Sequence, residues 1–463
     1  MTLMSDIEYR PIKKVFVANR GEIAVRVIRS CRELGIETVL AVSTVDRESV
    51  PARLADRTVC IGPPTASASY LNMAALITAA LGSGCDALHP GYGFLSENPE
   101  FAQMCVDNGL TFVGPAPHVV AEAGDKARAR EIARAAGIPV LTGSPILTDV
   151  EAASRAAAEI GYPVLVKASA GGGGRGMSVV ENDDELRARF SAAGSEAQSA
   201  FGDGSLFVEK YIRRARHIEV QVLGDRHGGV VQLGERDCTL QRRHQKVVEE
   251  SPAPGLDEAT QSRIRASGLA FAEAIGLDSA GTVEFIYDAD TGDYAFLEFN
   301  ARIQVEHPVT EAVTGVDLVR QQLRSAQGDR LEFGQGDVTT TGHAIEVRIT
   351  SESPRDGFLP RAGTLVRWRI PDADGIRVDT HAEEGYVVSP YYDSLLAKVV
   401  AYGTDRDDAI ARMLAALSAL DVQGVPTTAD FAHFALDHTD FRTGHVSTNW
   451  IAETGLPEFL ETP

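Results

Sequence analysis

The stretch Ala280–Pro308 constrains the fold more than any other part of this sequence. Two runs with the residue types of β-strands, Thr282–Tyr287 and Tyr294–Asn300, flank a short segment of turn-forming residues, which predicts a hairpin. If the hairpin folds symmetrically, Glu284 and Glu298 lie directly opposite each other. Like charges in such a pair, with Cβ atoms about 5 Å apart, destabilise a sheet. A hard divalent cation offsets the repulsion most simply, so the hairpin predicts a metal site.

The residues after the hairpin extend this polar surface. Side chains at alternate positions of an extended chain share one face. From the second carboxylate onward, that face would carry Glu298, Asn300, Arg302, Gln304 and Glu306. Such a row fits the floor of a site that holds metal and anion together. The alternative is the solvated face of an edge strand, although such faces more often carry Lys, Thr and Ser.

Length and composition exclude several classes of protein. At 463 residues the chain exceeds what one core usually supports, so two or three domains are expected. A formal net charge of −21 argues against nucleic-acid and anionic-membrane partners. No run approaches the roughly 18 apolar residues of a membrane span. Five cysteines without CxxC pairing, and an N-terminus without an apolar leader, predict a cytoplasmic protein.

The first part of the chain alternates between strand and helix patterns, which predicts a parallel sheet. The predicted strands are Lys14–Ala18, Thr38–Val42, Arg57–Ile61, Asp86–Leu88 and Thr111–Val113, and the predicted helices run from Ile23 to Leu34 and over Tyr70–Leu81. No GxGxxG follows the first strand, so no dinucleotide site is expected there. The loop His89–Asn98 follows a strand, at the end where ligands of such sheets bind.

A glycine-rich run, Gly171–Gly174 with Gly176, stands between two predicted strands, Tyr162–Ala168 and Met177–Val180. The letters match GxGxxG, but a strand rather than a helix follows, and the chain has no GxxxxGK[ST] loop. We therefore place these glycines at a hairpin tip, where free N–H groups could fold over phosphates as a lid. The alternative is a plain flexible loop, although consecutive glycines are entropically costly.

Cationic and polar side chains accompany this loop. Lys126 lies early in a predicted helix, Ala121–Gly137, where a positive charge opposes the helix dipole, so it is either an ordinary surface residue or a phosphate ligand. Lys167 lies near the end of a predicted strand. The dense polar stretch Glu235–Glu250 is either a solvated face or a pocket for a polyanion. Its candidate ligands are Gln241, Arg242, Arg243, His244 and Lys246.

The C-terminal part contributes one more candidate and a clear core helix. A predicted strand, Gly342–Ile349, carries Arg348. Thr404–Leu420 predicts an amphipathic helix capped through Thr404 and Asp407. The apolar stripe expected in the core is Ile410, Met413, Leu414, Leu417 and Leu420.

These features together indicate magnesium–nucleotide chemistry on a scaffold other than the P-loop. A glycine lid and lysines on strands suit phosphates, and facing carboxylates suit the metal ions that bridge them. The remaining group, Arg302, Gln304 and Glu306, suits a small anionic second substrate with a carboxylate as general base.

Six separated segments resemble the biotin carboxylases of the ATP-grasp superfamily, from about Lys13 to about Ile451. They are KKVFVANRGEIAVRVIR, HPGYGFLSEN, KASAGGGGRGM, ERDCTLQRRHQKVVEE, EFNARIQVEHPVTE and SPYYDSLLAKV. The resemblance implies a mixed α/β and α+β fold in three parts. These are an N-terminal parallel-sheet (pre-ATP-grasp) domain over residues 1–122, an ATP-grasp domain over 123–335 with a mobile glycine-rich lid at about 139–211, and a C-terminal biotin carboxylase domain over 343–455.

The resemblance also implies an activity: ATP-dependent carboxylation of biotin by bicarbonate through carboxyphosphate, the first half-reaction of an acetyl-CoA or acyl-CoA carboxylase. It implies two magnesium or manganese ions, a carboxyltransferase partner and a homodimer. No Met-Lys-Met attachment motif follows the C-terminal domain. Biotin is therefore expected on a separate biotin carboxyl carrier protein, unless this sequence is one domain of a longer polypeptide.

Residue roles carry over where the motifs match. The resemblance places at ATP Lys126, Lys167, Gly171, Gly172, Gly173, Gly174, Glu209, Lys210, His217, Gln241 and His244. It places the metal ions at Glu284, Glu298 and Asn300, and bicarbonate at Lys246, Arg302, Gln304 and the backbone of Val305. Glu306 would remove the proton of bicarbonate, and Arg348 would stabilise the biotin enolate. Two departures from the family pattern, Ala170 and Ala301, affect none of these positions.

Two other functions stay open from sequence alone. One is another ATP-grasp ligase, such as a carbamoyl phosphate synthetase half or a purine-pathway ligase, which would share the metal carboxylates. The other is a non-catalytic nucleotide-binding subunit that regulates a carboxylase complex. Retention of Glu306 and Arg348 argues against the second.

Overall fold

A five-stranded parallel sheet opens the fold of the computed structural model, which describes residues 9–147, 149–169 and 177–462. Its strands, in the order β3-β2-β1-β4-β5, all pair in parallel, which confirms the predicted sheet. α3 begins three residues later than predicted, because the Asn72 side chain accepts a hydrogen bond from the Ala75 N–H and caps the helix. The elements are β1 Lys14–Val17, α1 Gly21–Glu33, β2 Glu37–Ser43, α2 Val50–Leu54, β3 Arg57–Gly62, α3 Met73–Gly82, β4 Ala87–His89, α4 Pro99–Asp107 and β5 Thr111–Phe112.

The single helix predicted over Ala121–Gly137 is wrong, since two helices occupy this region. α5 spans Pro117–Gly124 and α6 spans Lys126–Ala135. Asp125 between them has extended backbone angles, and its side chain accepts hydrogen bonds from two N–H groups of the first turn of α6. The break makes Lys126 the first residue of a helix.

A small three-stranded sheet forms a separate unit. β6 (Val164–Ala168) pairs antiparallel with both β7 (Met177–Val180) and β8 (Leu206–Lys210). α7 (Val150–Ile160) and α8 (Asp183–Phe201) complete the unit, which has its own apolar core. The predicted strands on either side of the glycine run therefore pair as a hairpin. Gly171–Gly174 themselves lie outside the described residues.

An antiparallel eight-stranded sheet holds the centre of the molecule, in the order β13-β12-β9-β10-β11-β14-β21-β19. It joins the middle of the chain to the C-terminal part, because β11 pairs with β14. The polar stretch predicted around position 242 is the hairpin of β10 and β11, with Arg243 and His244 at its tip in the left-handed region. The elements are β9 Ala215–Gly224, β10 Val230–Arg242, β11 Gln245–Ser251, α9 Glu258–Ile275, β12 Ala280–Asp288, β13 Tyr294–Asn300, α10 His307–Thr314, α11 Leu318–Gln327, β14 His343–Thr350, β19 Ile376–Thr380 and β21 Leu395–Gly403.

The predicted amphipathic helix is α12, Arg406–Ala419. Its cap differs from the prediction: Asp405 accepts the Asp408 N–H, and Asp408 accepts the Thr404 N–H. Ile410, Met413 and Leu417 are buried, while Leu414 and Leu420 pack half-buried against the same core. The other C-terminal elements are β15 Glu352–Ser353, β16 Leu359–Pro360, β17 Gly363–Thr364, β18 Arg367–Arg369, β20 Val387–Val388, β22 Asp421–Gln423, α13 Ala429–Asp437, α14 Thr439–Arg442 and α15 Leu456–Glu461.

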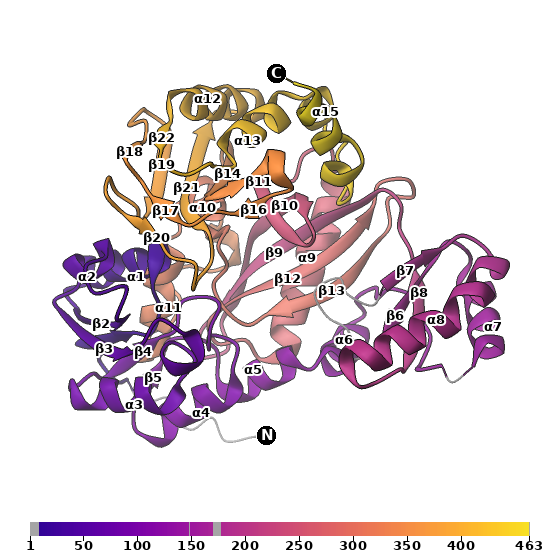
Figure 1. Cartoon of the computed structure of the whole chain (residues 1–463). Helices are drawn as coiled ribbons and strands as arrows, with labels where there is room; N and C mark the ends of the chain where they lie inside the picture. The colour runs from indigo at the N-terminus through magenta and orange to yellow at the C-terminus, as the bar shows by residue number, and fades with distance from the viewer. Residues whose placement is uncertain (1–8, 148, 170–176, 463) are drawn as a thin grey trace.

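Three parts of the chain are arranged about the central sheet (Figure 1). The C-terminal part, in orange and yellow, contributes β14, β21 and β19 to the sheet, the N-terminal sheet, in indigo and violet, lies below them in this view, and the β6–β8 unit projects on the right beyond β13. Each part has its own hydrophobic core. This mixed α/β and α+β arrangement confirms the predicted fold class. Among the described helices, none combines the length and apolar character needed to cross a membrane.

Candidate active site

The two carboxylates of the predicted hairpin do face each other, since Glu284 on β12 pairs with Glu298 on β13. The hairpin is not symmetric, however. Near the loop Tyr287 pairs with Tyr294, a register that would place Glu284 opposite Leu297. A bulge at Leu297 shifts the register by one residue and restores the facing pair.

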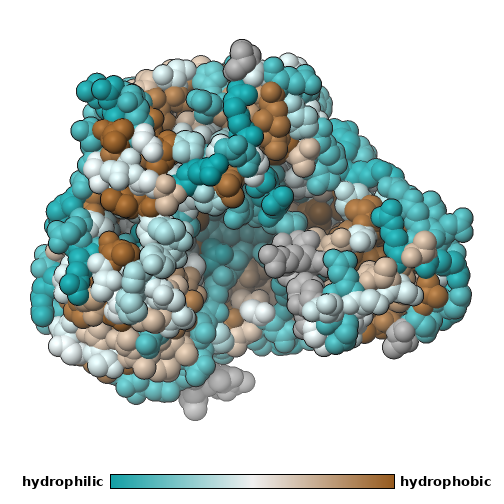
Figure 2. Space-filling view, in the orientation of Figure 1, coloured by the Kyte–Doolittle hydropathy of each residue, from teal (hydrophilic) through white to brown (hydrophobic). Residues whose placement is uncertain are grey.

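The extended row predicted beyond Asn300 is wrong, because the chain bends there and α10 begins at His307. The bend nevertheless brings the alternate side chains to one place. Arg302, Gln304 and Glu306 line a cavity of about 460 Å³ together with Glu284, Glu298 and Asn300. Ala301 and Ile303 are buried on the opposite side. In the space-filling view a hydrophilic hollow opens between the parts of the molecule (Figure 2).

The facing carboxylates have unequal surroundings. Glu284 accepts hydrogen bonds from the side-chain amides of Asn300 (2.9 Å) and Gln304 (2.8 Å) and pairs with His217 at 2.9 Å. Burial opposes ionisation, but nearby cations lower the pKa of Glu284 below its usual value. Burial and the charge of Glu284 raise the pKa of Glu298, whose partner Lys126 is 3.8 Å away. A divalent cation between them would remove this imbalance, so the donor set fits a hard metal ion.

A second possible metal-ligand group lies close by. Ligand atoms of His217, Glu219 and Glu284 lie within 4.8 Å of one another. Glu219, however, already pairs with Arg236 at 2.6 Å and with Lys246 at 2.5 Å. Within the part of the chain that the structure describes, Glu298 carries only the ion pair with Lys126 at 3.8 Å, so its carboxylate is the less saturated ligand, and we regard the Glu284–Glu298 pair as the better metal site.

Glu306 lies between two cations. Its carboxylate contacts the Lys246 ammonium on one side, and the Arg348 guanidinium lies 2.9 Å away on the other. Glu306 is 2% exposed. Burial would raise the pKa of Glu306, but the neighbouring Lys246 outweighs this and holds it below the usual value. The arrangement presents an ionised carboxylate that can accept a proton.

Arg302 connects the site to the N-terminal part. Its Nε donates to Glu97 at 2.8 Å, and its Nη2 donates to Asn300 at 3.1 Å. Glu97 belongs to the predicted ligand loop His89–Asn98. That loop therefore meets the site through a carboxylate and orients the guanidinium.

The same cavity is lined by five of the residues predicted at ATP: Lys126, Lys167, His217, Gln241 and His244. Burial lowers the pKa of His217, but the neighbouring Glu284 carboxylate outweighs this and raises it to about 9. Glu209 is buried behind Lys167 and pairs with it at 2.8 Å. The Lys210 ammonium donates to the carbonyls of Gly161 and Tyr162.

The two arginines of the predicted polyanion pocket do not line this cavity. Arg242 donates to the Gly357 carbonyl at 2.7 Å and lies over the Phe358 ring. Arg243 lies at the exposed tip of the β10–β11 hairpin. The tight turn between β10 and β11 therefore directs Arg242 and Arg243 away from this cavity, while Gln241, His244 and Lys246 line it.

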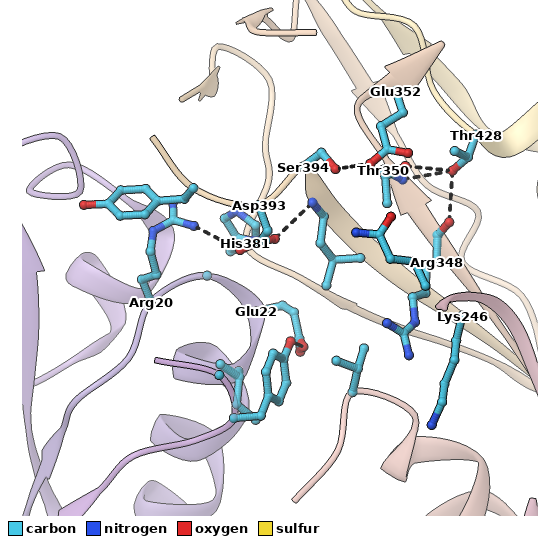
Figure 3. A pocket seen from close by; sticks show the side chains of 18 of the residues that line it. Arg20, Glu22, Lys246, Arg348, Thr350, Glu352, His381, Asp393, Ser394 and Thr428 are labelled. Carbon is cyan, nitrogen blue, oxygen red and sulfur yellow. Dashed lines mark hydrogen bonds and ion pairs between the residues drawn. The ribbon is translucent and has the colours of Figure 1, made fainter. Parts of the chain in front are cut away.

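A second cavity of about 520 Å³ adjoins the first, and both are lined by Lys246, Val305 and Arg348. Glu22 enters it from α1, whereas Arg348 and Lys246 enter from the central sheet (Figure 3). Arg20 and Asp393 form an ion pair across its wall (Figure 3). The N-terminal and C-terminal parts therefore enclose a passage that ends beside Glu306.

Sequence reasoning missed the buried charges behind the site. Arg236 is fully buried, and its guanidinium donates to Glu219, Gln221, Thr282, Gln304 and Thr310. Glu249 is also buried and accepts the Nε–H of Arg348 at 2.6 Å. Burial raises the pKa of Glu249 to about 7. A signal was available only for two partners of Arg236, because Glu219 and Gln221 alternate with apolar residues over His217–Leu223.

Comparisons with known proteins agree with this geometry. Family models match in order: the biotin carboxylase N-terminal domain over residues 11–120, the carbamoyl-phosphate synthase L chain ATP-binding domain over 125–333, and the biotin carboxylase C-terminal domain over 346–453. Biotin carboxylase 1 of Bacillus subtilis is 47% identical over 441 residues, which cover 95% of this chain and 98% of that protein. The chain belongs to the biotin carboxylase family.

Similar proteins come from different carboxylases. The mitochondrial methylcrotonoyl-CoA carboxylase subunit alpha of Oryza sativa is 47% identical over 95% of this chain, which matches 60% of that subunit. A crystal structure of the biotin carboxylase domain dimer of Hydrogenobacter thermophilus 2-oxoglutarate carboxylase, in complex with MgADP, ADP and bicarbonate, matches with a TM-score of 0.90. It is 46% identical, and the match covers 98% of this chain and 99% of that one. The three-part biotin carboxylase architecture is thus confirmed, while the individual domain boundaries stay predictions.

Proposed function

We propose that this chain carboxylates biotin with ATP and bicarbonate through carboxyphosphate, with the residue roles given below. The observation that carries the proposal is the place of Glu306. It is a buried carboxylate between Lys246 and Arg348, where a cavity with facing acids meets a second cavity. A base in this position serves an anion that must lose a proton before it attacks a phosphate.

In the proposed site, bicarbonate binds to Lys246, Arg302, Gln304 and the main chain of Val305. Glu306 takes the hydroxyl proton of bicarbonate, and the resulting oxygen attacks the γ-phosphorus of ATP, which releases ADP and forms carboxyphosphate. Carboxyphosphate then divides into CO₂ and phosphate, and the phosphate removes the N1′ proton of biotin. Arg348 stabilises the biotin enolate, which attacks CO₂.

Glu284 and Glu298, with Asn300 beside them, are the proposed ligands of two magnesium or manganese ions. Held there, such ions would neutralise the negative charge that develops during phosphoryl transfer. The chain's own part is to hold one carboxylate ionised through Asn300, Gln304 and His217, and to keep the other opposite it.

Nucleotide binding is assigned to the cavity end with Lys126, Lys167, His217, Gln241 and His244. Glu209 would orient Lys167, and Lys210 would support the adenine side through the backbone that it contacts. Gly171–Gly174 are assigned to a lid over the phosphates. Closure of such a lid excludes water, which protects carboxyphosphate from hydrolysis.

Biotin is assigned to the second cavity, which reaches Arg348 from the surface between the N-terminal and C-terminal parts. A biotin carboxyl carrier protein would deliver it, and a carboxyltransferase would use the product. The carboxylated acceptor stays open, because the relatives include a methylcrotonoyl-CoA carboxylase and a 2-oxoglutarate carboxylase. A homodimer, a cytoplasmic location and fatty acid biosynthesis are further parts of the proposal.

Phosphate release from MgATP tests the function. We expect release that requires bicarbonate and rises when free biotin is added. Release that responds to ammonia or amino acids, and not to bicarbonate or biotin, would indicate another ATP-grasp ligase. Tight MgATP binding without any release would indicate a regulatory subunit.

The metal assignment predicts the behaviour of Glu298→Gln. Loss of one charged ligand should raise the magnesium concentration for half-maximal phosphate release by about tenfold or more. A magnesium titration of the steady-state rate measures this effect. Glu273→Gln, an exposed change on α9, is the matched control and should leave the titration unaltered. An unaltered curve for Glu298→Gln itself would disprove the assignment.

A further inference from the structure

Lys398 on β21 is fully buried, and although it lies in the segment SPYYDSLLAKV, the sequence analysis gave it no role. It lies directly opposite Arg348 on the neighbouring strand β14. Two cations in directly opposed positions destabilise a sheet unless other groups separate their charges. Arg348 turns to Glu249 and Glu306. The positive charge of Lys398 must therefore be balanced by groups other than Glu249 and Glu306.

The Lys398 ammonium donates a hydrogen bond of 2.9 Å to the carbonyl oxygen of Val305. It also pairs with Glu22 of α1 at 3.1 Å and lies 3.8 Å from Asp379 of β19. Glu22 in turn accepts a hydrogen bond from the hydroxyl of Tyr92. One buried ammonium thus connects the N-terminal part, the C-terminal part and the segment that leads into Glu306.

The Val305–Glu306 segment needs such support. Glu306 is the residue before the first turn of α10, where a side chain often caps the helix. Its carboxylate makes no capping hydrogen bond and instead contacts Lys246 and Arg348. The main chain of this turn is therefore held from the other side, through the carbonyl of Val305.

We propose that Lys398 is a positioning residue for the bicarbonate step. Arg348 holds the side chain of Glu306, while Lys398 holds the peptide that joins Val305 to Glu306. Arg348 and Lys398 thus hold the turn through its side chain and through its main chain, so the Glu306 carboxylate stays within reach of the bicarbonate proton. The inference rests on the proposed function, because it takes Glu306 as the base.

Lys398→Met tests the inference, since it keeps the length of the side chain and removes the donor. Misplacing a catalytic group by about 1 Å costs about 100-fold in rate, so a smaller shift of the turn should cost about tenfold or more in kcat/KM for bicarbonate. The KM for MgATP should stay within about twofold, because Lys398 lies on the Arg348 side of the site.

The single change leaves Glu22 buried without its cation, which can prevent folding, whereas Asp379 keeps its ion pair with Arg377 at 2.8 Å. Lys398→Met combined with Glu22→Gln removes the unpaired charge of Glu22 and still leaves the Val305 carbonyl without its donor. Both variants are therefore assayed for bicarbonate-dependent phosphate release without biotin. Glu22→Gln alone provides the reference.

The matched control is Arg406→Met. Arg406 on α12 donates to the buried Glu250 at 2.7 Å. Glu250 lies on β11 of the same central sheet and makes no contact with the Val305–Glu306 turn among the hydrogen bonds and ion pairs of the described residues. This change should lower the melting temperature and leave the KM for bicarbonate unchanged. A folded double variant with wild-type kinetics for bicarbonate would overturn the role of Lys398. If the unaltered protein released phosphate from MgATP at a rate independent of bicarbonate, the proposed function itself would be refuted.

Discussion

Glu306→Gln should reduce bicarbonate-dependent phosphate release by about 100- to 10,000-fold, the usual contribution of a general base. Glutamine keeps the size of the side chain and can still contact Lys246 and Arg348, but it cannot accept the bicarbonate proton. MgATP binding should stay within about twofold, because the nucleotide end of the cavity is formed by other residues.

The comparison needs a buried glutamate outside the cavities. Glu250 is buried and pairs with Arg406 and His343, so Glu250→Gln removes a similar charge without touching the site. Stopped-time phosphate assays give the rates, and equilibrium titration with MgATP gives the affinity. If Glu306→Gln turned over at the Glu250→Gln rate, another group would have to be the base.

Arg236→Met should lower the free energy of unfolding by about 3–5 kcal/mol, the usual cost of removing one partner from a buried charge pair. The guanidinium is fully buried, and its Nε donates to Glu219 at 2.6 Å. Methionine fills similar space but leaves Oε1 of Glu219 and the oxygen of Gln304 without their donor, although Oε2 of Glu219 keeps Lys246. The free Gln304 amide would then also hold Glu284 less firmly.

Thermal unfolding of the purified protein measures the change. Arg213→Met is the surface control, since Arg213 pairs with Glu181 where both side chains are exposed, and it should cost no more than about 1 kcal/mol. Adding Glu219→Gln to Arg236→Met should recover part of the loss, because it removes a buried charge that has lost one of its cations. A melting temperature of Arg236→Met equal to that of the surface control would contradict the expected network.

The sequence predicted the parts of the site that depend on local spacing. The facing pair Glu284 and Glu298 follows from the alternation of side chains along two adjacent strands. The symmetric hairpin assumed for this prediction is not present, but the bulge at Leu297 shifts the register by one residue and produces the same pair. The short segment after Asn300 was predicted as extended and is bent, yet its alternate residues still reach one cavity. Spacing is informative wherever the interacting residues lie within one hairpin.

Contacts between residues far apart in the sequence could not be predicted from the sequence. Arg302 meets Glu97 across 205 positions, and Lys398 meets Val305 across 93. Such pairs depend on how separate cores pack, which periodicity does not encode. Helix ends were also misplaced where an acidic residue had two possible roles, as with Asp125, which breaks a predicted helix and caps the next one.

The central sheet passes from the middle of the chain into the C-terminal part without interruption, through the β11–β14 ladder. A hinge between these parts would have to break backbone hydrogen bonds in the interior of a sheet. They therefore form one cooperative unit, in which local opening costs nearly as much as global unfolding. The β6–β8 unit has its own core and its own small sheet, so it can move as a body while the base, the metal ligands and the biotin cavity keep their relative positions.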